Sequence, residues 1–277
     1  IPLIIVVFMS VSIVSILNIS WLNLKPETTS VLLGYNNFWQ LNANMDYFAR
    51  HVSSPFMHLW YISILLQYDL VFPIIFKILR KVGDKISKII PCVITIVYSV
   101  IMALFFYKSN LTQNMMIVYY NTFTRIFSLL FGLSLGFIHS YYGGLIPKKL
   151  KQEKIGQVIF YIYLSIMICF FILVDAKSSY YAYSMILVTI LTCRLIDYGT
   201  LQTKKISIVD KVIKSLASIS YEIYLFQYPI IFIFQYININ NIFYLPLVIL
   251  IIIILSYLLH FAINNKKLKF LKLTVMI

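Results

Sequence analysis

The chain has 277 residues, of which 61% are hydrophobic and 12% charged, and its formal net charge is +14. Water-soluble domains are nearer half apolar and a quarter charged, so this composition excludes an ordinary soluble domain and indicates a polytopic membrane protein. Its three cysteines lie scattered in apolar segments without the spacing of metal ligands, so we expect no metal site and no disulfide framework.

Crossing a bilayer takes about 20 mostly apolar residues, and a lipid-facing backbone must form its own hydrogen bonds, so each such segment is expected to be a helix. We therefore predict an all-α fold, a transmembrane helix bundle with about eight membrane helices forming a single domain over 1–277. The predicted segments are 1–20, 58–77, 89–107, 118–142, 155–175, 180–199, 216–237 and 243–263. Because Ile1 starts inside an apolar run without a signal-peptide pattern, we interpret the chain as a fragment.

The positive charge is concentrated in alternate connections between these segments. Of the 23 basic residues, 17 lie in the stretches 77–88, 148–154, 204–214 and 266–272. The positive-inside rule makes these stretches and the C-terminus cytoplasmic and places 21–57 outside the cell. We therefore expect a multi-pass protein of the cell membrane that contacts the lipid bilayer and binds no nucleic acid.

The second segment carries His58, Gln67 and Asp69 within an apolar run. Counting 100° per residue puts His58 and Asp69 on nearly the same helix face, about three turns apart, and groups Gln67 with Trp60. A charge at the centre of a membrane helix costs about 2.5–3.5 kcal/mol, so we expect Asp69 to face away from lipid. Two interpretations remain open: a paired or protonated structural acid, and part of a substrate or proton path.

The fourth segment contains Arg125, whose helical face also holds Gly132 and Gly136. Small residues at this spacing permit close helix packing, so we expect Arg125 to point into the bundle. A buried arginine needs an anion, and the candidates are Asp69, Glu222 and a phosphate or carboxylate of a ligand. Both a ligand-binding or catalytic role and a structural ion pair remain open.

The seventh segment carries a polar stripe of Ser220, Tyr224 and Gln227, with Tyr221 beside it and Pro229 expected to bend the helix. The stripe is either the lining of a pore or site, or a set of hydrogen bonds between helices.

Three ordered motifs resemble the acyltransferase-3 family of integral membrane acyltransferases. They are "SPFMHLW" with Gln67, Tyr68 and Pro73, then "YYNTFTRIFSLLFG", then "ISYEIYLFQYP". The wording of the third motif is most similar to that of Gram-positive peptidoglycan O-acetyltransferase-like members. The resemblance implies transfer of an acyl group, usually acetyl, from cytoplasmic acetyl-CoA (an acyl-CoA donor, with no bound cofactor) to a hydroxyl of an extracytoplasmic glycan. A separate extracytoplasmic SGNH-type transferase is a further implied partner.

The resemblance also assigns candidate residues to the site. Arg125 is the candidate cation for an oxyanion or the acyl donor, Asp69 the candidate relay acid, and His58 the third catalytic candidate. The candidate substrate-binding residues are Trp60, Gln67, Tyr119, Tyr120, Ser220, Tyr221, Tyr224 and Gln227.

The sequence departs from the family pattern at three points. Leu65 and Leu66 occupy the region of a usual glutamate, Gln227 replaces a usual histidine, and the family's principal arginine and histidine belong to a helix preceding residue 1. Two other functions therefore stay open: a carrier or flippase for lipid-linked sugars, and a catalytically inactive membrane fragment.

Overall fold

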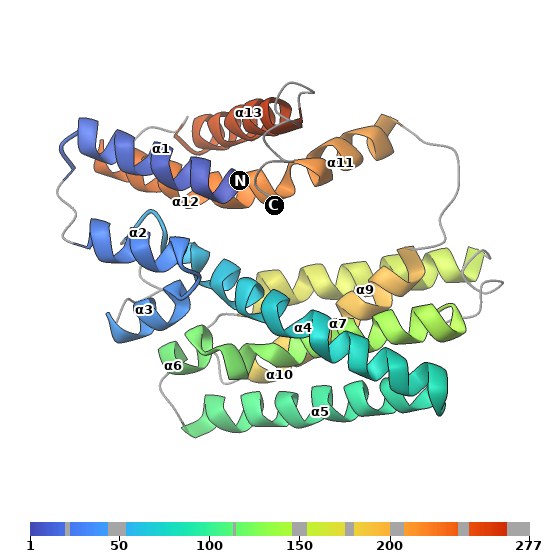
Figure 1. The fold of residues 1–277 in the computed structure, drawn as a ribbon. Helices are drawn as coiled ribbons and strands as arrows, with labels where there is room; N and C mark the ends of the chain where they lie inside the picture. Colours follow the sequence, from blue (N-terminus) through green and yellow to red (C-terminus); the bar gives the residue numbers. More distant parts are fainter. Residues whose placement is uncertain are drawn as a thin grey trace. The chain divides into compact units, whose positions relative to one another are not determined.

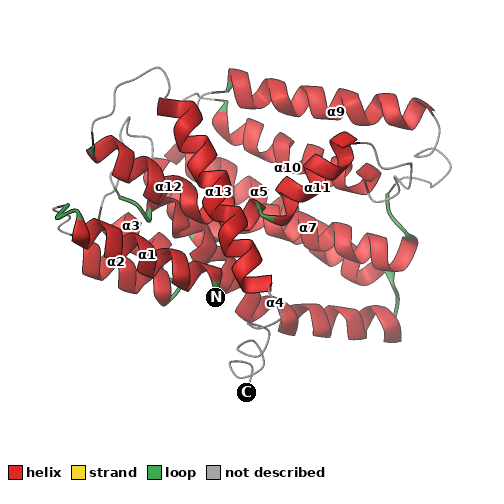
Figure 2. Cartoon of the chain, turned by 90° about the horizontal axis from the view of Figure 1, so that it is seen from above, coloured by secondary structure: helices red, strands yellow, loops and turns green. Residues whose placement is uncertain are grey.

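A computed structural model describes residues 1–19, 23–43, 54–112, 115–145, 154–174, 180–199, 208–237 and 244–264. Within these ranges the regular structure is helical throughout, with no strand, as Figure 2 shows. The predicted all-α class is confirmed. The chain divides into two compact units, Ile1–Ile64 with Lys205–Ile277, and Leu65–Lys204.

The first unit combines the two ends of the chain. Its elements are α1 (Pro2–Ile16), α2 (Leu24–Leu32), α3 (Asn36–Asn42), the 3₁₀ turn η1 (Met57–Leu59), α11 (Ile208–Ser218), α12 (Ser220–Tyr236) and α13 (Tyr244–Asn264). Helix α12 packs against α13 and α1, and α2 packs against α3 and α1 (Figure 1). Helix α12 continues through Pro229, where a bend was expected. The chain instead bends by 62° between α11 and α12.

The second unit is built from the middle of the chain. Its helices are α4 (Trp60–Lys85, from Leu65 onward), α5 (Ile89–Thr112), α6 (Met115–Tyr120), α7 (Thr122–Tyr142), α9 (Lys154–Leu173) and α10 (Tyr181–Gly199). Helix α7 packs along α5, and α10 packs against α9, α7 and α5. The buried rings of Phe106 and Phe127 stack with centroids 5.0 Å apart in this core. Burying each such side chain contributes about 1.5–3 kcal/mol.

Six described helices are long and apolar enough to cross a membrane, and a seventh is counted when α11 and α12 form one bent span. The chain is therefore a multi-pass membrane protein. The count is slightly below the expected eight because α1 has 15 residues, fewer than a straight crossing needs.

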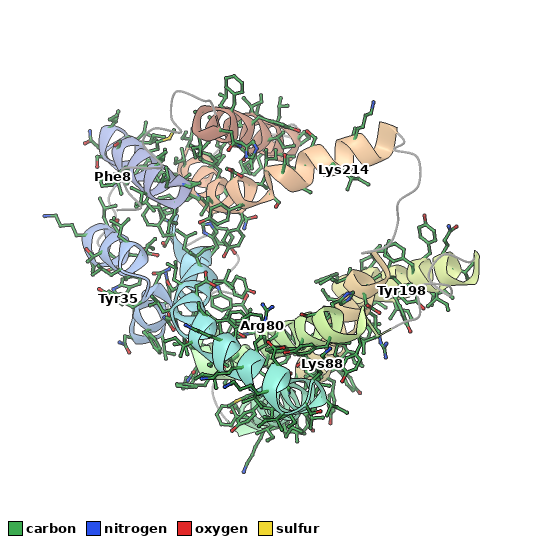
Figure 3. All side chains as sticks on the ribbon, turned by 45° about the vertical axis from the view of Figure 1, so that its right-hand side comes forward. Phe8, Tyr35, Arg80, Lys88, Tyr198 and Lys214 are labelled. Carbon is green, nitrogen blue, oxygen red and sulfur yellow. The ribbon has the colours of Figure 1, made fainter. Side chains whose placement is uncertain are left out.

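The first basic stretch was expected to be a loop, but most of it is helical. Helix α4 extends to Lys85, so Arg80 lies on a helix and forms an ion pair of 3.7 Å with Asp84. Figure 3 labels Arg80, Lys88 in the turn before α5, and Lys214 on α11. All three basic side chains are exposed.

The glycines predicted to allow close helix packing do not do so. A Cβ atom added to Gly132 or Gly136 would meet no heavy atom of the described residues within 4 Å. At Gly83 of α4, by contrast, an added Cβ would lie 2.9 Å from a side-chain carbon of Pro91 and even closer to Tyr141. The close approach is thus made by α4, and Gly83 is the residue that permits it.

Candidate functional site

Helix α7 begins at a break between α6 and α7, whereas the sequence predicted one continuous segment over 118–142. Asn121 caps α7, and its side-chain oxygen accepts a hydrogen bond of 2.9 Å from the backbone N–H of Phe123. The hydroxyl of Thr124 donates to the carbonyls of Val118, at 2.5 Å, and Asn121, at 2.8 Å. These bonds tie α6 to α7 and place Arg125 in the first turn of α7 rather than two turns into a longer helix.

Arg125 is 6% exposed and is surrounded by aromatic groups, as its predicted orientation into the bundle required. Its Nε donates to the carbonyl of Tyr119 at 3.1 Å, and its Nη2 donates to the hydroxyl of Tyr181 at 3.0 Å. The guanidinium carbon lies 4.5 Å from the ring centroid of Tyr119, 5.4 Å from that of Phe106 and 6.0 Å from that of Tyr181. We call Phe106, Tyr119, Arg125 and Tyr181 the Arg125 cluster. Ring quadrupoles and a carbonyl dipole stabilise its positive charge.

The Arg125 cluster draws its residues from α5, α6, α7 and α10 and does not include Asp69. Asp69, one of the three candidate anions for Arg125, is exposed on α4. Gln67, from the same part of α4, does reach the start of α7, where its Oε1 accepts a hydrogen bond of 2.7 Å from Thr122. Tyr120 is completely buried next to the cluster residue Tyr119 in the chain. The structure therefore brings Gln67, Tyr119, Tyr120 and Arg125 to the α6–α7 break.

His58 belongs to the first unit, whereas the Arg125 cluster belongs to the second. It is fully buried in η1, and its ring stacks on Tyr228, with centroids 4.5 Å apart and an interplanar angle of 12°. The Tyr224 ring lies 5.0 Å away, and the Tyr224 hydroxyl donates to the backbone carbonyl of His58. Both ring nitrogens are buried without a hydrogen-bond partner in the part of the chain that the structure describes, although the backbone of Tyr224 and Leu225 lies beside them.

The expectation that His58 and Asp69 share one helix face is wrong. The count of 100° per residue assumes an unbroken α-helix, but His58 belongs to a 3₁₀ turn that precedes α4. His58 is buried and Asp69 exposed, so they do not form one polar path down α4. Trp60, which begins α4, is buried beside this turn.

The polar stripe on α12 separates into different environments. Ser220 and Tyr221 are exposed, and the Ser220 hydroxyl donates to the carbonyl of Ala217 at 2.9 Å. Gln227 lines a largely apolar groove of about 450 Å³ between α12 and α13. Tyr224 alone reaches the His58 turn, so the stripe is not one continuous lining.

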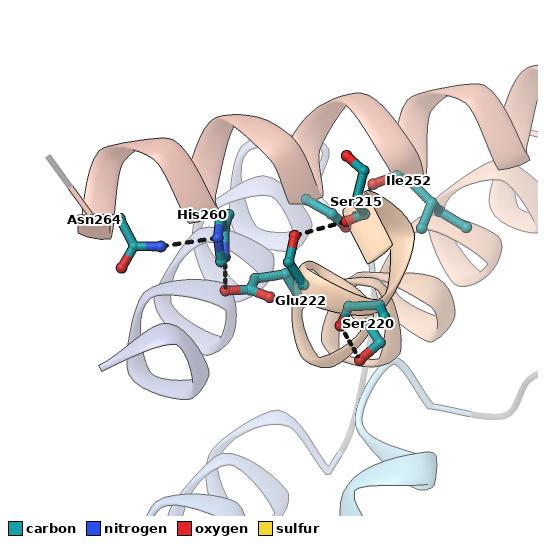
Figure 4. A network of polar contacts seen from close by, with 9 residues as sticks. Ser215, Ser220, Glu222, Ile252, His260 and Asn264 are labelled. Atoms are coloured by element: carbon teal, nitrogen blue, oxygen red, sulfur yellow. Dashed lines mark hydrogen bonds and ion pairs between the residues drawn. The ribbon is translucent and has the colours of Figure 1, made fainter. Parts of the chain in front are cut away.

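Glu222, one of the anions considered for Arg125, has a partner in its own unit. Figure 4 shows its carboxylate beside His260 of α13, and the Oε1–Nδ1 distance is 3.2 Å. Asn264 holds the other nitrogen of the same imidazole at 2.8 Å. These contacts join α12 to α13 and give Glu222 a structural partner.

A similar pair, which the sequence did not indicate, closes the end of α7. His139 Nε2 lies 2.7 Å from Oδ1 of the fully buried Asp197, which also accepts a hydrogen bond of 3.2 Å from the backbone N–H of Leu145. Arg194, three residues before Asp197 on α10, is the neighbour that helical spacing alone indicates. The observed contacts hold the chain where it leaves α7 at Gly143, which has a positive φ of 77°.

The largest polar group that the sequence reading missed surrounds Glu27 of α2. Glu27, Asn36, Gln40 and Ser54 are each 0% exposed. Burial raises the pKa of Glu27 to about 8, although hydrogen bonds from Ser54 and Gln40 act to lower it. Glu27 lies outside the long apolar segments, so the cost of a charge in lipid gave no reason to single it out; its position upstream of Ser54-Pro55 was the only available signal.

Groups of three or more His, Cys, Asp or Glu side chains placed to hold a metal ion do not occur among the described residues. The arrangement instead offers a fixed guanidinium within aromatic rings and a buried imidazole held by its backbone. Such groups are suited to binding a polar or anionic reactant and stabilising developing charge.

Long apolar helices that enclose these groups define a multi-pass membrane protein with polar sites inside its helix bundles. The chain belongs to the acyltransferase domain family, whose model matches residues 1–264. The resemblance carried by the three motifs is thus confirmed.

Curated relatives agree with this family. The O-acetyltransferase OatA of Staphylococcus aureus strain NCTC 8325 / PS 47 is 28% identical over 232 residues, which cover 76% of this chain and 35% of the relative. OatA of strain COL matches with the same values. The chain thus spans about a third of the length of these relatives. No solved structure matches it.

Proposed function

We propose that this chain is the membrane part of an O-acyltransferase that moves an acetyl group from a cytoplasmic acyl-CoA to a hydroxyl of an extracytoplasmic glycan. Peptidoglycan or another cell-wall polysaccharide is the acceptor in this proposal. Family membership and the naming of the staphylococcal relatives as O-acetyltransferases support it. The single observation that carries it is the burial of Arg125, at the centre of the family motif "YYNTFTRIFSLLFG", within the Arg125 cluster.

Acyl transfer builds negative charge on the carbonyl oxygen of the acyl group, and a fixed cation lowers the energy of that state. Tyr119 and Tyr181 hold the guanidinium by two hydrogen bonds, so it needs little reorganisation during the reaction. A guanidinium presents its N–H donors in a planar fork, a geometry that matches an oxyanion or a phosphate of the acyl donor. Arg125 therefore either stabilises the transition state or anchors the donor.

The basic end of α4 favours a polyanionic acyl donor that approaches from the side of the membrane on which this end lies. A shallow hollow of about 500 Å³ at this end of the helix is lined by four basic residues, Lys77, Arg80, Lys81 and Lys85, together with Asp84 and Phe76. Because basic stretches mark the cytoplasmic face, the hollow would face the compartment that supplies acyl-CoA. Phosphate groups of the donor are the natural partners of such a surface.

The proposal is tested in membranes from cells expressing the complete reading frame. Radiolabelled acetyl-CoA is supplied on the cytoplasmic side, and acetate released by mild alkali from purified wall polysaccharide is counted. We expect Arg125→Ala to abolish the glycan-bound label while membrane insertion stays intact. Lys214→Gln, which changes an exposed charge on α11, should transfer acetate as the natural protein does.

Two results would contradict this function. Arg125→Ala membranes that release as much acetate as the natural protein would remove Arg125 from the site. Membranes that move lipid-linked sugars without consuming acetyl-CoA would instead support the carrier function.

A further inference from the structure

The Glu27 network consists of Glu27 and Ser30 on α2, Asn36 and Gln40 on α3, and Ser54 before η1. All five side chains are 0% exposed, and they come from three separate segments of the first unit. A buried polar group costs free energy unless it is hydrogen-bonded, so this concentration of polar side chains requires a structural or functional reason.

The network holds the turn that leads to His58. Oε1 of Glu27 accepts hydrogen bonds from the Ser54 hydroxyl at 2.5 Å and from Nε2 of Gln40 at 2.7 Å. The Ser54 oxygen in turn accepts from the backbone N–H of Phe56 at 3.0 Å. Glu27 is therefore connected through one side chain to the backbone two residues before His58.

Asn36 holds the same turn from α3. Its Nδ2 donates to the carbonyl of Phe56 at 3.1 Å, and its backbone N–H donates to the Ser63 hydroxyl of α4 at 3.0 Å. The Asn36 Oδ1 accepts from Ser30 at 2.9 Å. The Glu27 network thus bonds the chain before and after His58, and Tyr224 bonds the carbonyl of His58 itself.

The His58 ring stacks on Tyr228 and is attached to the backbone of this turn. A shift of the turn would consequently move the imidazole directly. Small displacements of a reactive group cost large factors in rate.

We propose that Glu27 is a positioning residue for acyl transfer: as a neutral carboxylic acid it fixes the Ser54–His58 turn and thereby the His58 imidazole. This inference rests on the proposed function, because it gives the imidazole a part in the reaction.

The hydrogen-bonding atoms favour the neutral acid. Oε2 of Glu27 and Oε1 of Gln40 are both buried and lack a hydrogen-bond partner among the described residues. Both are acceptors when Glu27 is ionised, whereas a proton on Oε2 turns that atom into a donor. A buried carboxylate is costly where, as among the described residues here, it has two neutral donors and no cation.

The surroundings of Glu27 contain little charge in the described part of the chain. Helices α1 and α3, which pack against α2, contain no charged residue within Pro2–Ile16 and Asn36–Asn42. Lys25 of α2 is exposed, and His58 is the titratable group on the turn that the network holds. Burial accordingly raises the pKa of Glu27 to about 8.

The test compares Glu27→Gln, Glu27→Leu and the natural protein in membranes, using the acetate-transfer assay from pH 6 to pH 10. Glutamine keeps the Oε1 acceptor and stays neutral, whereas leucine has similar volume and no acceptor. Lys25→Gln is the matched control, because it changes an exposed charge on the same helix by one unit.

At pH 7 we expect Glu27→Gln to retain activity within about threefold, and Glu27→Leu to lose roughly tenfold or more, with kcat affected more than KM. Above pH 8 the ratio of Glu27→Gln to natural activity should rise, because only the natural side chain ionises. Lys25→Gln should follow the natural pH profile.

A constant ratio across the pH range, or equal activity of Glu27→Leu and the natural protein, would overturn the positioning role. Glu27→Gln that is as inactive as Glu27→Leu, although both insert into membranes at natural levels, would also overturn it, because it would show that the neutral form is insufficient. Absence of acetate transfer by the natural protein would instead contradict the proposed function. A fluorescence melting scan of each purified variant in detergent identifies any variant that fails to fold. If Glu27→Leu fails to fold, the pH dependence of the Glu27→Gln to natural activity ratio alone decides.

Discussion

The Arg125 cluster and the Glu27 network accommodate buried ionisable groups in opposite ways. An arginine cannot lose its charge in a protein, so the second unit surrounds Arg125 with aromatic faces, a carbonyl and a phenol hydroxyl. A carboxyl group can become neutral, and the first unit gives Glu27 two neutral donors and no cation among the described residues. On the proposed function, the chain keeps a permanent buried charge where that charge can act on a reactant, and a neutral acid where the side chain holds a turn.

The largest expected effect is on the stability of the first unit. The effect requires Glu27 to be neutral in the folded protein, so an ionised Glu27 would contradict the comparison. The pKa of Glu27 is raised from 4.5 to about 8. Below pH 4.5 the carboxyl is protonated in both folded and unfolded chains, so its burial carries no ionisation penalty. From pH 4.5 to about 8 the unfolded chain ionises first, so the free energy of unfolding falls with rising pH, by roughly 5 kcal/mol in total.

This prediction is checked by the melting temperature of the purified protein in detergent at several pH values. The natural protein should lose stability between pH 5 and 8 relative to Glu27→Gln, whose curve lacks this contribution. Parallel curves for the two proteins would show that Glu27 is charged in the folded state.

The next largest effect distinguishes the geometry of Arg125 from its charge. Lysine retains the charge but not the planar fork that bonds both Tyr119 and Tyr181. We expect Arg125→Lys to reduce the rate of acetate transfer by about 100-fold, the size of effect seen when an oxyanion donor is lost. Tyr181→Phe, which removes one hydrogen bond and keeps the ring, should cost about tenfold or less.

The proposed role of Arg125 requires Arg125→Lys to lose more transfer activity than Tyr181→Phe. A lysine variant as active as the natural protein would mean that charge alone suffices and that the aromatic cluster is only structural packing. Membrane levels of each variant, measured by immunoblot, provide the control for insertion.

The smallest effect on acetate transfer is expected for substitution of Asp69, and it compares an exposed charged group with the enclosed Arg125. Asp69 is exposed and lies outside the Arg125 cluster, so Asp69→Asn should change acetate transfer by about threefold or less. The measurement is the same transfer assay in membranes. A loss as large as that of Arg125→Lys would restore Asp69 as the acid that acts with Arg125.

The sequence was sufficient to predict the helical class, the multi-pass character and the enclosure of Arg125. These rest on composition and on the cost of a charge in lipid, both of which are properties of the residues themselves. The relation between His58 and Asp69 could not be predicted in the same way, because it assumed one regular helix where a 3₁₀ turn comes first.

Glu27 was missed for a different physical reason. Its burial comes from contacts with Gln40 and Ser54, which are 13 and 27 residues away in the chain, and no local pattern encodes them. Similarly, the partner of Asp197 proved to be His139, 58 positions earlier, whereas helical spacing pointed to Arg194. Long-range polar pairs are decided by packing, which a single sequence does not display.

The most direct test of the central claim is the transfer of labelled acetate from acetyl-CoA to purified cell-wall glycan by membranes with the natural protein and with Arg125→Ala. We predict alkali-releasable label on the glycan with the natural protein and background label with the variant, at equal amounts of inserted protein. Equal label in both membranes would contradict the account.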